Sequence, residues 1–207
     1  MKWIDVQQNS DEWVALRVGR IGGSSIGTIM ANYGKAFGEP AHSLAVKIAL
    51  EQIKGESFES SYTNAHMERG HEQEPIARAL YESEYFCDVT NGGYIIVSDN
   101  IGVSPDGLVY DDGLIEIKSV ISSVQFKTVK RGKFDPSYKW QLAFNLKCSE
   151  RDWIDYVSFC AEFPEGKRLF VQRLTQEDFA EEFEMIITRL AEFRNLVSEK
   201  KEVINRI

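Results

Sequence analysis

The sequence contains few cysteines and histidines, and neither type has the spacing of a metal site. The three cysteines are Cys87, Cys148 and Cys160, and the three histidines are His42, His66 and His71. An odd number of widely spaced cysteines without a CxxC pair predicts reduced thiols rather than a disulfide framework. Three cysteines are also too few for an all-cysteine iron–sulfur site. Without zinc-ligand spacing, each histidine is expected to have a structural or surface role.

Long hydrophobic runs are also missing. No apolar segment approaches the length of a membrane span, and the start of the chain lacks the pattern of a signal peptide. The 207 residues are 43% hydrophobic and 12% aromatic, which fits a globular protein with a sizeable core. We therefore expect a cytoplasmic protein without a membrane partner and with a single domain. It would comprise a helical part over residues 1–60, a catalytic core over 61–175 and a C-terminal helix over 176–207.

An excess of positive charge is absent, because the formal net charge is −8. This argues against a broadly basic protein that coats nucleic acid, but not against an enzyme with one basic channel. Residues 126–147 contain six basic residues and one acid, whereas residues 175–192 contain six acids and one arginine. The basic side chains expected to hold a DNA backbone are Lys35, Lys127, Lys130, Arg131 and Lys133. The alternative is an ordinary solvated run of charge.

Periodicity and turn signals predict a mixture of helices and strands. Helices are expected over residues 10–19, 24–30, 43–54, 64–86, 122–130, 136–148 and 179–197, and strands over 94–97, 108–110, 114–117, 155–161 and 168–173. Ser10 is expected to cap the first helix, and residues 32–40 to form a loop. Pro75 predicts a kink or a fresh helical start. The last helix is expected to dock on the sheet, with a coiled coil as the alternative.

Residues 102–118 contain the most informative pattern. Asp111-Asp112-Gly113 between two short apolar runs predicts a β-hairpin. Glu116 and Lys118, two residues apart on a strand, share a face, and pairing across the turn brings Asp106 towards it. Two close carboxylates favour Mg²⁺, and a neighbouring lysine can orient water or stabilise charge on a phosphate. The alternative is a surface hairpin with one Glu–Lys pair.

A second pattern lies near the N-terminus. A glycine turn at Gly22-Gly23 followed by Ser24 and Ser25 predicts a helix start with a serine cap. Backbone N–H groups at such a start favour an anion, and the nearby Arg17 can clamp a phosphate. Ser24 can also be a helix cap and no more.

These segments together resemble one nuclease family. Asp106 followed by Glu116-x-Lys118 resembles the motif of the restriction-endonuclease-like PD-(D/E)xK nucleases. The match is closer to the phage lambda exonuclease and YqaJ-type viral recombinase family, also called alkaline exonucleases. Further similar blocks are Trp13…Leu16-Arg17…Gly19…Ser24, Gly70-x-x-x-Glu74 and Tyr138-x-x-Gln141, with the strands between and after them. The resemblance covers residues 10–175 and implies an α/β fold, with a restriction-endonuclease-like core in which helices flank a central mixed β-sheet.

The resemblance also implies roles for individual residues. Mg²⁺, with Mn²⁺ as a substitute, would be bound by Asp106, Glu116 and the backbone carbonyl of Ile117, and by Glu74 directly or through water. Lys118 would position or activate the attacking water. The residues implied for a 5′-phosphate pocket are Arg17, Ser24, Ser104 and Gln141, with the choice between Ser24 and Ser25 open.

The implied activity is digestion of linear double-stranded DNA from 5′ ends. The products would be mononucleotides and a 3′ single-stranded overhang for recombination. The implied partners are DNA ends, two further copies in a ring-shaped homotrimer and a single-strand annealing protein, in a phage or prophage setting within a bacterial host. The alternatives are an endonuclease or repair nuclease of the same fold, distinguished by cleavage of closed circular duplex, and a non-catalytic DNA-end-binding module.

Overall fold

The computed structural model describes residues 1–58 and 65–206, with the backbone alone for residues 65–67. Five strands form the main sheet in the order β2-β5-β6-β7-β8. Their bounds are β2 Val89–Asn91, β5 Gly107–Val109, β6 Gly113–Ser119, β7 Trp153–Phe159 and β8 Leu169–Thr175. Only the β6–β7 pairing of this sheet is parallel, and the other three are antiparallel. A smaller sheet joins β1 Lys2–Ile4, β3 Tyr94–Ser98 and β4 Ile101–Val103.

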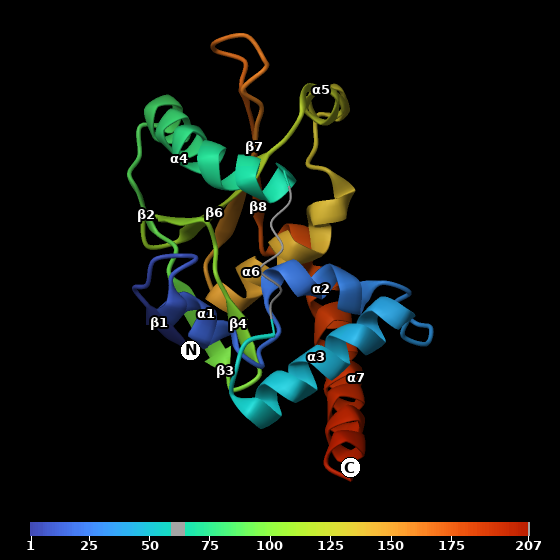
Figure 1. Cartoon of the computed structure of the whole chain (residues 1–207). Helices are drawn as coiled ribbons and strands as arrows, with labels where there is room; N and C mark the ends of the chain where they lie inside the picture. Colours follow the sequence, from blue (N-terminus) through green and yellow to red (C-terminus); the bar gives the residue numbers. More distant parts are fainter. Residues whose placement is uncertain (59–64, 207) are drawn as a thin grey trace.

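Helices cover both faces of the main sheet (Figure 1). Their bounds are α1 Asp11–Arg17, α2 Gly23–Met30, α3 Glu39–Lys54, α4 Ala65–Tyr85, α5 Ser122–Arg131, α6 Lys139–Ser149 and α7 Ala180–Ile204, with short 3₁₀ turns at Pro136–Tyr138 and Glu177–Phe179. Ile115 and Ile117 of β6 pack with α4 on one face, whereas Leu114 packs with α2, α3, α6 and α7 on the other. The expected α/β class with a central mixed sheet flanked by helices is thus confirmed.

The α4 helix is attached to the sheet by a buried polar contact. The hydroxyl of Tyr81 donates to Asp155 Oδ2 on β7 over 2.6 Å, and Arg173 on β8 donates to both oxygens of Asp155 over 2.8 and 2.9 Å. Asp155 is 1% exposed, so these donors provide the partners that a buried carboxylate requires. The same helix carries Glu74 about two turns earlier.

Several element predictions need correction. The α3 helix begins at Glu39, four residues before the expected start, because Pro40 in its first turn fits a helix N-terminus. The α4 helix continues through Pro75 without a fresh start. Its expected first residue, Asn64, lies outside the described residues, as does the side chain of His66. The short strands β1, β2 and β4 were not predicted, since three residues give little periodicity.

The last helix differs in part from its prediction. It packs mainly against α3, α6 and α2, and strand residues such as Ile154 and Tyr156 belong to the same core. The buried side chains of α7, which include Phe183, Ile186 and Phe193, share one core with these helices. Other parts of the chain therefore cover its apolar face, as expected for a docked helix and not for a coiled coil. Within residues 1–58 and 65–206, no helix is long and apolar enough to cross a membrane.

Candidate active site

The hairpin of β5 and β6 brings Asp106 to Glu116. Gly107 pairs with Ile115, so Asp106 enters the hairpin beside Glu116. Asp106 Oδ2 accepts a hydrogen bond from the Ile117 N–H over 2.6 Å, which fixes the carboxyl against the strand. Glu116, unlike a surface residue, is 1% exposed, and the side chain of Lys118 is 20% exposed. The alternative of a solvated surface hairpin is therefore wrong.

Three side chains donate hydrogen bonds to the Glu116 carboxylate. Lys118 Nζ and Gln141 Nε2 approach Oε1 at 2.6 and 2.5 Å, and Asn145 Nδ2 approaches Oε2 at 2.8 Å. Gln141 and Asn145 lie one turn apart on α6, which places both amides on the same side of the helix. Gln141, which was expected in the phosphate pocket, contacts Glu116. Asn145 was not predicted, although its i+4 spacing from Gln141 was visible in the sequence.

The electrostatics of this cluster follow from burial and from like charges. Burial raises the pKa of Asp106 well above its ordinary value, and the Glu116 carboxylate raises it further. Burial alone would lower the pKa of Lys118, but the carboxylates of Glu116 and Asp106 outweigh it and raise this pKa. Lys118 is therefore a cation at neutral pH. The two carboxyls repel each other, and a dication relieves such repulsion.

Glu74 approaches the pair from α4. Burial raises its pKa, and the Glu116 carboxylate adds to this against the opposing effect of Arg78. Arg78 Nη2 lies 3.8 Å from Glu74 Oε1 and donates to the backbone oxygen of Asp106. Arg78 therefore links α4 to the hairpin. Like Asn145, it was not predicted, although it stands four residues after a predicted site residue.

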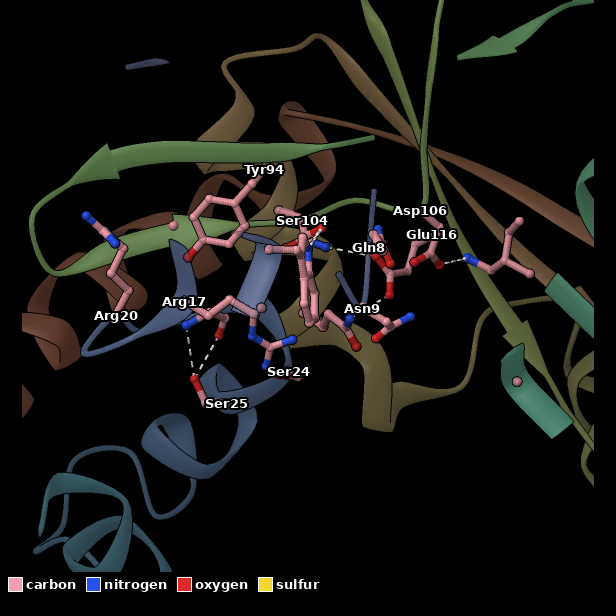
Figure 2. Close-up of a pocket in the computed structure, with 18 of the residues that line it drawn as sticks. Gln8, Asn9, Arg17, Arg20, Ser24, Ser25, Tyr94, Ser104, Asp106 and Glu116 are labelled. Atoms are coloured by element: carbon pink, nitrogen blue, oxygen red, sulfur yellow. Dashed lines mark hydrogen bonds between the residues drawn. The ribbon is translucent and has the colours of Figure 1, made fainter. Parts of the chain in front are cut away.

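The acidic residues line one end of a cavity of about 440 Å³. Figure 2 shows Asp106 and Glu116 at this end, and Arg17, Ser24 and Ser25 towards the other. Asp106 and Glu116 offer the hard oxygen ligands that Mg²⁺ takes from one or two carboxylates, with water completing its shell. In the part of the chain that the structure describes, no group of three or more His, Cys, Asp or Glu side chains could hold a metal ion. The residues thus fit Mg²⁺ through the pair of carboxylates rather than through a ready-made triad.

Arg17 is positioned through an aromatic ring and a serine. Its guanidinium carbon lies 4.1 Å from the centroid of the Trp13 ring, and Trp13 Nε1 donates to Ser104 Oγ over 2.9 Å. The Ser104 hydroxyl in turn donates its proton to the Gly93 carbonyl over 2.6 Å. Ser104, which was expected to bind phosphate, therefore donates its hydroxyl proton to the backbone and accepts from Trp13, which packs against Arg17. Ser104 thus contributes to the position of Arg17 through Trp13.

The helix start beside Arg17 differs in detail from its prediction. The α2 helix begins at Gly23 with Gly22 as its N-cap, so Ser24 is not a cap. Ser25 Oγ accepts from the Gly22 N–H over 3.2 Å and donates to the Gly22 carbonyl over 2.9 Å. Because Ser25 is used by the turn, the exposed Ser24 is the hydroxyl available to an anion.

The structure does not place the remaining predicted basic residues in this cavity. Residues Lys127 and Lys130 lie exposed on α5, Arg131 is the last residue of that helix, and Lys133 follows it. Lys35 is exposed in the turn before α3. None of them is among the residues that line the cavity. A contact of these side chains with DNA backbone outside the cavity stays a prediction.

The chain resembles known proteins in both sequence and structure. Residues 12–152 match the YqaJ-like viral recombinase domain, which is more than half of the chain. The chain belongs to this family. The alkaline exonuclease LHK-Exo of Laribacter hongkongensis is 31% identical, with a TM-score of 0.79 over 95% of this chain and 99% of that one. Its structure in complex with dAMP is 30% identical, with the same TM-score and the same coverage.

A more distant structure shares the fold of this YqaJ-like protein. A phage-related exonuclease from Haemophilus somnus 129PT is 15% identical, with a TM-score of 0.65 over 90% of this chain and 96% of that one. The comparison with curated proteins found no match. Family and fold are thus those of exonuclease-type nucleases, as the resemblance implied.

Proposed function

We propose that this YqaJ-like protein is a Mg²⁺-dependent 5′-to-3′ exonuclease of linear double-stranded DNA. It releases mononucleotides and leaves a 3′ single-stranded overhang for recombination. The observation that carries the proposal is the arrangement of one cavity, with Asp106, Glu116 and Lys118 at one end and Arg17 with Ser24 at the other. A site suited to hydrolysis and a site suited to a terminal phosphate are then parts of the same cavity.

The acidic end supplies the chemistry. When bound by Asp106 and Glu116, Mg²⁺ polarises a phosphoryl oxygen and lowers the pKa of a bound water. Glu74 adds a further carboxylate from α4, directly or through water, and the backbone carbonyl of Ile117 is a further candidate ligand. Lys118, whose Nζ lies 2.6 Å from Glu116 Oε1, positions or activates the attacking water and stabilises charge on the phosphate.

The basic end fixes the position of the cut relative to the 5′ end of the strand. Arg17, held on Trp13, and Ser24, in the first turn of α2, bind the 5′-phosphate together with backbone N–H groups of that turn. Phosphate contacts carry no base sequence, so the enzyme counts from an end rather than reading a site. The complex of the relative LHK-Exo with dAMP, a deoxynucleoside monophosphate, supports a mononucleotide product.

The surroundings of the cavity complete the proposal. The exposed basic residues of α5 and the following loop hold the duplex backbone. By its resemblance to the lambda exonuclease group, the protein acts as a ring-shaped homotrimer with a single-strand annealing partner. Light scattering at three times the 23.6 kDa chain mass would support the trimer, and the mass of a single chain would contradict it.

A nucleotide-release assay tests the function. Linear duplex with Mg²⁺ should yield mononucleotides, closed circular duplex should stay intact, and Mn²⁺ should substitute for Mg²⁺. Lys118→Ala should lower the rate on the order of 10²- to 10³-fold, the loss typical of a group that stabilises developing charge. Cleavage of the circle would favour an endonuclease, and no release from either substrate would favour a DNA-end-binding module.

A further inference from the structure

Asn145 lies between the acidic end of the cavity and the first turn of α2. Asn145 is 1% exposed, and its Nδ2 donates to Glu116 Oε2 over 2.8 Å. On the other side, its Oδ1 faces Gly23, where an added Cβ would stand 2.3 Å from that oxygen. The amide thus spans the gap between the strand that carries Glu116 and the helix turn that carries Ser24.

Only the nitrogen of the Asn145 amide has a hydrogen-bond partner, and its oxygen has none among the described residues. Among the described residues, Oδ1 has no hydrogen-bond partner, and a buried acceptor without one costs free energy. The fold nevertheless presses this oxygen against Gly23, the position where any side chain would collide with it. Asn145 therefore contacts Glu116 at one end of the cavity and the first turn of α2 at the other end.

We infer that Asn145 is a positioning residue that sets the distance between the acidic pair and the phosphate-binding turn. This inference rests on the proposed function. A 5′-phosphate held at Ser24 and a scissile phosphate at Glu116 are successive phosphates of one strand when a mononucleotide leaves. The amide between them keeps the α2 turn at that separation, so the length of the product depends on Asn145.

Three variants and a control test this role. Asn145→Ala should lower the rate of nucleotide release about 10- to 100-fold, as the loss of a group that orients a metal ligand does, and should admit dinucleotides among the products. Gly23→Ala should have the same effects, because the new Cβ displaces the amide from Glu116. The double variant should be no worse than Asn145→Ala. Ser149→Ala, which removes a buried hydroxyl further along α6, is the matched control and should keep wild-type products.

The same four proteins are compared by their free energy of unfolding without divalent ions. Alanine is a better helix former than glycine, so a destabilised Gly23→Ala variant identifies the collision, and the Asn145→Ala background should relieve it. Additive losses in the double variant, or mononucleotides alone at the wild-type rate from Asn145→Ala, would overturn the inference. Failure of the proposed function looks different, because the wild-type protein itself would then release no nucleotides from linear duplex.

Discussion

Replacing Asp106 by asparagine should make the metal-free protein more stable while abolishing its nuclease activity. The pKa of Asp106 is raised by burial and by Glu116, so the charged carboxylate costs folding free energy. Each unit of such a shift corresponds to about 1.4 kcal/mol. Asparagine keeps an oxygen for the Ile117 N–H and removes the charge, so we expect a gain on the order of 1 kcal/mol. For a chain of this size that is about 2–4 °C in Tm.

The sign of the pH dependence follows from linkage. A carboxyl with a raised folded-state pKa contributes stability below its unfolded pKa and loses it as the pH rises through the folded value. The advantage of Asp106→Asn should therefore be largest at neutral to alkaline pH. It should fade as the pH falls towards about 4, the ordinary aspartate pKa.

Thermal unfolding in EDTA and in MgCl₂ checks both effects. In EDTA at pH 8, Asp106→Asn should melt at a higher temperature than the wild type. Asp111→Asn, an exposed change in the same hairpin, is the control and should melt at the wild-type temperature. Mg²⁺ should raise the Tm of the wild type, more so at higher pH, and should leave Asp106→Asn unchanged. A variant that melts below the wild type in EDTA would refute the repulsion on which the metal site is argued.

Three further predictions concern the neighbours of the site. Arg17→Ala should slow digestion of 5′-phosphorylated ends more than of 5′-hydroxyl ends, and equal slowing in a paired rate assay would contradict the phosphate pocket. Gln141→Ala should slow both kinds of end equally, since its amide contacts Glu116; a selective loss on phosphorylated ends would restore it to that pocket. Tyr81→Phe should lower the free energy of unfolding by about 1–3 kcal/mol, because a donor to the buried Asp155 is lost. Denaturant titration measures this, and an unchanged midpoint would count against the contact.

The parts of the site that are local in sequence were predictable. Asp106, Glu116 and Lys118 lie on one hairpin, where the turn signal and the period of two fix which side chains share a face. The N-cap at Ser10 followed from the same local reasoning, and its hydroxyl accepts from the Trp13 N–H. Local rules give the face of an element, but not what covers that face.

What could not be predicted depends on contacts between distant segments. The main neighbours of α7 are helices, and no pattern within α7 distinguishes helices from a sheet as its packing partner. The Ser104 hydroxyl donates to the backbone carbonyl of Gly93, between β2 and β3, so a residue type suited to phosphate has a different partner. Gln141 was predicted to line a phosphate pocket; it does line the cavity, but its contact with Glu116 depends on how α6 crosses the sheet.

The parallel pairing of β6 with β7 has a consequence for the order of folding. The acidic hairpin depends on contacts over about ten residues, which are local, whereas the amides that hold Glu116 come from 25 and 29 residues further along the chain. They arrive only when the crossover through α5 and α6 returns the chain to β7, and such long-range parallel pairing forms slowly. After dilution from denaturant, hairpin structure should therefore precede the return of activity. A nascent chain that ends before β7 would carry the acidic residues without a working site.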